Sequence, residues 1–203
     1  ALQFLPKSLH DDLRFAVFKP NLERHRLFSL VETMNMCTAR ALCYDAMDYI
    51  VIQPNEDLFV AGGLCGRAWC IIHGEMTYTQ DPHTSPVMFV TSEQVTRNSW
   101  LCEAALWVHW IHVGRARCSI ACQLLVIDSE HLMHTLKKHQ LVQQLSHGYS
   151  VEFHKRVCAA RPPLRIWPTD LSVPLADFEH IAVSLPKNVR AAIGLHVLDG
   201  PET

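Results

Sequence analysis

Two stretches decide the fold of this chain: QPNEDLFVAGG at residues 53–63 and AWCIIHGEMTYT at residues 68–79. Both contain short runs of β-branched, aromatic and aliphatic residues that are interrupted by Gly, Pro, Asn or Asp, a texture typical of strands joined by turns. In the second stretch, residues 73–75 have a central glycine and favour a reversal of the chain. The sequence therefore predicts two strands, 68–72 and 76–79, that are joined by a tight turn.

Further strand-like runs lie on both sides of these stretches, at residues 49–52, 87–90, 117–120 and 124–127. Residues 103–106 (EAAL) interrupt the rhythm and favour a single helical turn lodged between strands. Short strands with turns at near-regular spacing are typical of a sandwich, a jelly roll or a small barrel. We expect a β-roll from Met47 to Asp128.

Helical periodicity flanks this region. It predicts a helix over residues 9–17 that Pro20 ends, a turn at residues 25–28, and a short helix at 38–46. Apolar residues four apart across residues 132–157 predict a short helix followed by a long one. The expected fold is α+β: a double-stranded, jelly-roll-like β-roll with N-terminal linker helices, a one-turn helix inside it and two C-terminal helices.

Composition limits the function classes. The net charge of −2, with 49% hydrophobic and 19% charged residues, gives no reason to expect a nucleic acid polymer as partner. The segment contains no apolar run of about 18 residues, so we expect no membrane span in it. Its eight cysteines include no Cys-x-x-Cys pair. They are therefore expected to be reduced thiols in a cytosolic setting, without a structural metal site.

The order of these motifs resembles the cyclic-nucleotide-binding domain family. Residues 53–62 and 69–75 are similar to the front half of that domain, with its acidic turn and glycine-terminated strands. Residues 101–106 resemble the phosphate-binding cassette, and residues 122–128 resemble the strand before the two C-terminal helices. The apolar residues within 5–28 are similar to the C-linker of voltage-gated and cyclic-nucleotide-gated cation channels.

The resemblance implies three parts: C-linker-like helices at 1–36, a cyclic-nucleotide-binding-type domain at 37–160, and an extended, Pro-containing tail at 161–203 with one short helix near 187–193. It implies a non-catalytic regulatory domain on the cytoplasmic side of a membrane, as part of a cation channel such as a potassium channel. The implied partners are a pore domain in the same polypeptide and further copies in a homotetramer. The resemblance implies no cofactor. It implies cAMP or cGMP as the regulatory ligand.

The implied ligand site consists of Leu101, Cys102, Glu103, Ala104, Ala105, His112, Val113 and Arg115. The family's site needs backbone N–H groups at a helix start for the phosphate, a carboxylate for the ribose, and an arginine for the phosphate charge. Glu103 stands at the position of the ribose-binding glutamate. Cys102 replaces a glycine, and its Cβ is expected to crowd the phosphate.

His112 stands where the family has its phosphate-binding arginine, and Val113 replaces the Thr or Ser that follows it. If the alignment of this sequence with the family is shifted along the chain, Arg115 is the nearest cationic residue that takes the arginine's position. A histidine offers only a fractional charge at neutral pH, so the resemblance implies weak or no nucleotide binding. Some channel families have such homology domains with a protein segment in the cavity, and the tail from Leu164 onward is a candidate segment.

Two alternatives stay open at this point. The predicted fold is equally compatible with a regulatory or interaction module of a non-channel signalling protein. A cupin-like metalloenzyme shares the double-sheet architecture and would use His109 and His112 with Glu103 nearby. The His-x-His pair of such enzymes is missing, however, and bulky apolar residues surround these histidines.

Overall fold

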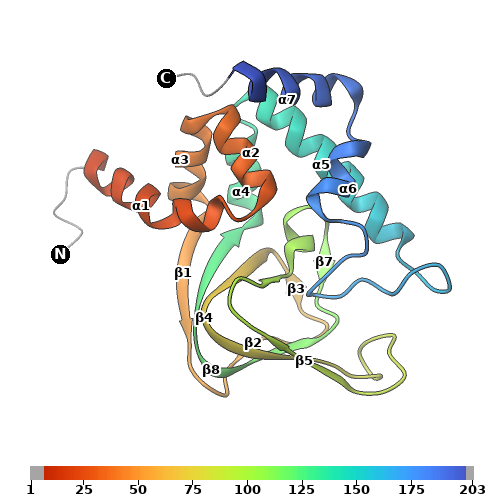
Figure 1. Ribbon diagram of the computed structural model, residues 1–203. Coiled ribbons are helices and arrows are strands. Elements are labelled where there is room, and N and C mark those ends of the chain that lie inside the picture. Colours follow the sequence, from red (N-terminus) through yellow and green to blue (C-terminus); the bar gives the residue numbers. More distant parts are fainter. Residues whose placement is uncertain (1–6, 200–203) are drawn as a thin grey trace. The chain divides into compact units, whose positions relative to one another are not determined.

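The computed structural model describes residues 7–199 and has the predicted α+β fold, with helices and a curled antiparallel β-roll (Figure 1). Contacts divide these residues into two compact units. We call residues 7–47, 130–152 and 178–199 the helical unit, and residues 48–129 and 153–177 the roll unit. Each unit is therefore built from segments that are far apart in the sequence.

In the helical unit, helix α1 (Lys7–Leu22) runs through Pro20, so the predicted end at this proline is wrong. Phe15, Phe18 and Leu22 are buried, and Leu22 is only 1% exposed. Burial of Leu22 favours a further turn of helix after the proline, which offsets the lost backbone hydrogen bond. The apolar residues at helical spacing within 9–17, from which the helix was predicted, face solvent and not the core, as the half-exposed Leu13 shows.

Helix α2 (Arg26–Met34) occupies the place of the predicted turn at residues 25–28, so that prediction is wrong. The reason is burial, since Phe28 belongs to an apolar helix face and is completely covered. Helix α3 (Met36–Asp45) confirms the helix predicted at 38–46. It begins at Asn35, whose side chain accepts a hydrogen bond from the Thr38 amide at 2.7 Å.

The roll unit is built on two long antiparallel strands, β4 (Arg67–Gln80) and β8 (Arg115–Asp128), which curve side by side in Figure 1. Four strands extend this sheet: β1 (Met47–Ile52), β2 (Asp57–Phe59), β5 (Thr91–Val95) and β6 (Trp100–Leu101). A separate two-stranded sheet pairs β3 (Leu64–Cys65) with β7 (Trp110–Ile111). Ile71, Leu124 and Leu125 are fully buried; Ile71 pairs with Leu124 across the two long strands, and the adjacent Leu125 points to the opposite face of the sheet.

The predicted turn at residues 73–75 is wrong, because β4 continues through it. The register between β4 and β8 shifts three times between Ile71 and Met76, which is the mark of β-bulges. Gly74 has a φ of +92°, and a Cβ there would lie 2.4 Å from the carbonyl oxygen of Ala121. The glycine therefore bends the strand without reversing it, and the runs at 117–120 and 124–127 likewise merge into β8.

Residues 87–90 were expected to form a strand but lie in a loop. Met88 and Phe89 are 86% and 74% exposed, so no layer covers their apolar side chains. The next strand is β5 instead, where Val95 is buried opposite Met76. Hydrophobicity alone thus misplaced this strand by several residues.

The predicted one-turn helix is confirmed as η2 (Glu103–Leu106). Helices α4 (Ser129–Leu136) and α5 (Gln140–Ala159) confirm the two C-terminal helices. In the tail, α7 (Lys187–Asp199) confirms the helix predicted near 187–193, whereas α6 (Phe178–Ser184) lies in a part that was expected to be extended. Among the described residues, none of the helices combines the length and apolar character needed to span a bilayer.

Candidate functional site

The helical turn η2 opens at Cys102, the residue that replaces the family's glycine. Cys102 has φ 57° and ψ 34°, the left-handed conformation that glycine adopts at little cost. Its side chain is 1% exposed and points into the roll. Its amide donates a hydrogen bond to the backbone carbonyl of Asp170, a residue of the tail. The start of this helical turn therefore binds a segment of the same chain.

Asp170 is the most completely bonded side chain of the roll unit, and it is 1% exposed. Its Oδ2 accepts hydrogen bonds from the Val113 amide at 2.9 Å, the Gly114 amide at 2.8 Å and the Tyr78 hydroxyl at 2.9 Å. Its Oδ1 accepts from Trp110 Nε1 at 2.8 Å. The carboxylate thus sits in a ring of donors, the environment that a buried anion requires.

A tight local turn presents Asp170 to the roll. The amide of Thr169 donates to the Ser172 carbonyl at 2.8 Å, and the Thr169 hydroxyl accepts from the amides of Leu171 and Ser172. These bonds satisfy part of the turn's backbone internally, while the Asp170 amide donates to the Tyr78 hydroxyl at 3.4 Å and the Asp170 carbonyl accepts from the Cys102 amide. The segment is therefore held in one shape with Asp170 at its tip.

His112 follows β7 and is 5% exposed. Its ring stacks on Phe59, with centroids 4.0 Å apart and planes 5° from parallel. Its Nδ1 lies 3.0 Å from Asp170 Oδ1. Burial works against the charged imidazolium, but the hydrogen bond to Asp170 and the nearby Cys65 thiol outweigh it and raise the pKa of His112 to about 9.

The same balance operates at Asp170. Burial favours the neutral acid, but hydrogen bonds from His112, Trp110 and Tyr78 hold the pKa of the Asp170 carboxyl below its usual range. An imidazolium and a carboxylate at hydrogen-bond distance form a buried ion pair at neutral pH. Such a pair is costly to break from one side, because the remaining charge is left without a partner.

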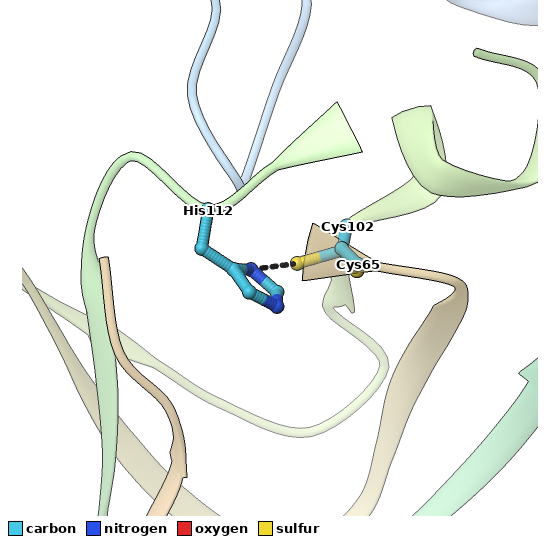
Figure 2. Close-up of side chains that lie close together, drawn as sticks. All are labelled: Cys65, Cys102 and His112. Atoms are coloured by element: carbon cyan, nitrogen blue, oxygen red, sulfur yellow. Dashed lines mark hydrogen bonds between the residues drawn. The ribbon is translucent and has the colours of Figure 1, made fainter. Parts of the chain in front are cut away.

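Two thiols lie beside this pair. Cys65, from β3, and Cys102 bring their sulfur atoms into a group with a ring nitrogen of His112, all within 4.8 Å of one another (Figure 2). Cys102 Sγ lies 3.5 Å from His112 Nδ1, the contact drawn as a dashed line. A hydrogen bond from Cys102 lowers the pKa of the Cys65 thiol to about 5, while burial raises the pKa of the Cys102 thiol. Cys65 is therefore the thiolate of the pair.

The structure brings only part of the predicted ligand site together. Leu101, Ala104 and Ala105 are buried core residues that carry no polar side chain to the site. Glu103 is half-buried and lines a cavity with Phe153 and the tail residues 169–173. The predicted glutamate position therefore faces the chain's own tail.

Arg115 does not reach the site. It is exposed on β8, where its Nε and Nη2 donate to the two carboxylate oxygens of Asp57 at 2.8 and 2.7 Å. Arg117 also faces Asp57, with 3.9 Å between Nε and Oδ1. Val113 takes part through its amide, which donates to Asp170. The roll thus places a histidine and backbone amides where the resemblance expects an arginine.

Sequence reasoning missed Asp170, Tyr78 and Cys65. Asp170 lies 56–92 residues from its partners, so no local spacing links them. The cysteines likewise come from separate elements and lack the paired spacing of a metal motif. One feature of the sequence could have drawn attention to Asp170: it is the charged residue of the segment WPTDLSV at 167–173, among apolar and hydroxyl side chains.

The fold and site define an α+β protein with a β-roll, a helical turn at its mouth and a buried acidic centre. No protein-family model matches the sequence, and no curated protein matches it significantly. Among solved structures, the chain is similar to a cyclic nucleotide-binding-like protein from Brucella abortus bv. 1 str. 9-941, with 19% identity and a TM-score of 0.44. The match covers 53% of this chain and 90% of that one.

Proposed function

We propose that the chain is a non-catalytic regulatory domain of the cyclic-nucleotide-binding type whose ligand site is occupied by its own tail. The observation that carries this proposal is the Asp170 carboxylate, which receives donors from Val113, Gly114, Tyr78 and Trp110 beside the helical turn η2. A helix start and converging N–H groups are the features by which proteins bind phosphate. Here an aspartate of the same chain takes the place of that anion.

Three further observations support weak or no nucleotide binding. Asp170 places a negative charge where a phosphate would have to enter, and like charges repel strongly in a buried site. Cys102 introduces a Cβ and a sulfur at the mouth of the helical turn. Arg115 is engaged with Asp57 at the surface. Losing one charge-assisted hydrogen bond of about 1.5–3 kcal/mol raises the dissociation constant of the nucleotide by about one to two orders of magnitude.

The channel context comes from the C-linker resemblance of residues 5–28. In this proposal, a pore domain in the same polypeptide and a fourfold assembly complete the protein on the cytoplasmic side of a membrane. Displacement of the tail from the roll would shift the population of two conformations, with about 1–3 kcal/mol of coupling energy. Hydropathy with six apolar spans in the full-length protein would support the channel, and its absence would favour a non-channel signalling module.

Calorimetric titration with cAMP and with cGMP tests the occupied site. We expect no measurable binding by the wild-type chain at about 1 mM ligand, the level that corresponds to about −4 kcal/mol. We expect weak binding by Asp170→Asn, because this change removes the competing charge and loosens the tail. Asp177→Asn is the matched control: this exposed aspartate lies on the same tail and should leave binding unchanged.

Micromolar binding by the wild-type chain would overturn the proposal directly. This outcome does not depend on how well any variant folds. A wild-type chain that binds neither nucleotide, together with an Asp170→Asn variant that stays folded and gains no binding, would instead indicate that the site has lost the nucleotide for reasons other than the tail.

A further inference from the structure

Cys65, Cys102 and His112 form a cluster that the self-occupied site does not explain. Each of the three offers one ligand atom, and these atoms all lie within 4.8 Å of one another. All three residues are buried. A buried thiolate, thiol and imidazole in mutual contact need either a strong hydrogen-bond network or a shared cation.

The distances place three ligands close enough together to share a cation. Zinc–sulfur bonds of about 2.3 Å and zinc–nitrogen bonds of about 2.0–2.1 Å place neighbouring ligand atoms roughly 3.5 Å apart. Cys102 Sγ lies 3.5 Å from His112 Nδ1 and 3.5 Å from Asp170 Oδ1. His112 Nδ1 lies 3.0 Å from the same carboxylate oxygen. Cys65 Sγ completes a group with Cys102 and His112, whereas Asp170 contacts Cys102 and His112 but does not belong to the group whose ligand atoms all lie within 4.8 Å of one another.

The surroundings hold these ligands in place. Phe59 stacks on the His112 ring, and Trp110 Nε1 donates to Asp170 Oδ1, so neither side chain can turn away at low cost. Partners of this kind orient metal ligands and are nearly as important as the ligands themselves. Cys65 Sγ lies 3.1 Å from the Arg67 carbonyl oxygen, a contact that a bound cation would replace.

We propose that Cys65, Cys102 and His112 bind a zinc-type divalent cation, and that Asp170 Oδ1 shifts towards the cation to become the fourth ligand. Two thiolates, one imidazole and one carboxylate make a closed, four-coordinate site. A closed site has no open position for substrate water and is structural. It therefore differs from the catalytic site of a cupin-like enzyme, and His109, which is exposed, takes no part.

A cleft in the roll unit gives the cation a way in. Residues 58–60 and 63–67 line it together with Trp69 and Asp128, and both Cys65 and His112 reach its wall. Asp128 at this cleft is paired with Arg67, with 3.5 Å between Oδ2 and Nε, so the two side chains offset each other's charge at the entrance. The ligands are thus buried but not sealed from solvent.

The inference deepens the proposed function in one respect, because the fourth ligand belongs to the tail. A cation held jointly by the roll and by Asp170 would fasten the tail in the site. The three roll ligands do not rest on the proposed function. If Asp170→Asn retains cation binding but gains no nucleotide binding, the metal site stands and the proposed function fails.

The test is titration of the purified, reduced chain with Co²⁺ and then Zn²⁺, followed by absorption spectroscopy. We expect one Co²⁺ per chain, sulfur-to-cobalt charge-transfer bands and the visible bands of tetrahedral cobalt, all removed by Zn²⁺. Cys65→Ser, Cys102→Ser and His112→Gln should each weaken binding by more than the about 10–100-fold that loss of an outer partner costs. Asp170→Asn should weaken it less.

The control variant is Cys118→Ser/Cys122→Ser, which removes the other pair of neighbouring buried thiols in the roll unit. We expect it to bind Co²⁺ as the wild-type chain does. Because buried variants can unfold, alkylation of the wild-type chain gives a second measurement. Zinc should protect Cys65 and Cys102 from alkylation and leave the exposed Cys37 reactive.

Several results would overturn the inference. One is cobalt binding that is absent or lacks charge-transfer bands. Another is binding that survives in Cys65→Ser but is lost in Cys118→Ser/Cys122→Ser, since the cation would then sit at the other thiol pair. A third is equal alkylation of Cys65 and Cys102 with and without zinc.

Discussion

The backbone nitrogen of Gly114 donates to Oδ2 of Asp170 across 2.8 Å, although the two residues are 56 positions apart in the sequence. Gly114 has no room for a side chain, since a Cβ there would lie 2.4 Å from the hydroxyl of Tyr78, which donates to the same carboxylate. The close approach of these residues makes the tail an integral part of the roll unit.

Asp170→Asn should lower the free energy of unfolding of the roll unit by about 3–5 kcal/mol. The change leaves the His112 imidazolium without its counter-ion and sets an amide N–H₂ against existing donors. All five tryptophans lie in the roll unit, so fluorescence during urea denaturation reports on it. Glu93→Gln, at an exposed acidic residue of β5, is the stability control and should change the value by less than about 0.5 kcal/mol. Equal stability of the two variants would contradict the assigned hydrogen bonds.

Gly74→Ala should destabilise the roll far more than Gly62→Ala. Both glycines have positive φ, +92° and +85°, so both substitutions carry the same backbone strain of about 1–2 kcal/mol. Only at Gly74 does the new Cβ also meet backbone, at 2.4 Å from the Ala121 carbonyl oxygen, whereas Gly62 has nothing within 4 Å. Thermal unfolding of both variants measures the difference. Similar losses would mean that the bulge in β4 is not as described.

Arg115→Gln should raise the pKa of Asp57 towards its ordinary value of about 3.9. The hydrogen bonds from Arg115 are the largest cause that lowers the pKa of this carboxyl in the folded chain. A lowered folded pKa stabilises the fold above the unfolded value, and this stabilisation is lost as the pH falls through the folded pKa. NMR titration of the Asp57 carboxyl carbon measures the shift. Arg117→Gln is the control and should have a smaller effect, because that contact is 3.9 Å long.

Zinc should stabilise the wild-type roll unit if the cluster binds it. At a free concentration of about 100 times the dissociation constant, binding to the folded state alone adds about 2.7 kcal/mol to the free energy of unfolding. Urea denaturation with and without zinc measures this gain, and Cys102→Ser should show almost none of it. A gain of equal size in this variant would place the stabilising cation elsewhere.

Local patterns in the sequence predicted the elements whose burial is periodic. The row that contains Leu145, Tyr149 and Phe153 is buried along α5 as expected, and EAAL at 103–106 forms its helical turn. The same reasoning failed where an apolar residue lacks a covering layer, as at Met88, or where a glycine bends a strand, as at Gly74. Both failures depend on tertiary contacts that no local window contains.

From the sequence, only those residues of the candidate site that lie between the start of the one-turn helix and β8 could be predicted. The resemblance directed attention to Cys102 and His112, and both lie in the site. Asp170 and Cys65 belong to segments that fold onto these residues from a distance, and their roles depend on the closed roll. In the sequence, the bulky apolar residues around His112 argued only against a cupin-like metal site. The structure shows instead that they bury an ion pair with Asp170.

Hydrogen exchange of the Val113 and Gly114 amides, followed by NMR at residue level, tests most directly whether the tail fills the roll. Slow exchange in the wild-type chain, unchanged by excess cAMP and much faster in Asp170→Asn, is the result we expect. Rapid exchange of both amides in the wild-type chain, or protection that appears only when cAMP is added, would mean that Asp170 does not occupy the site.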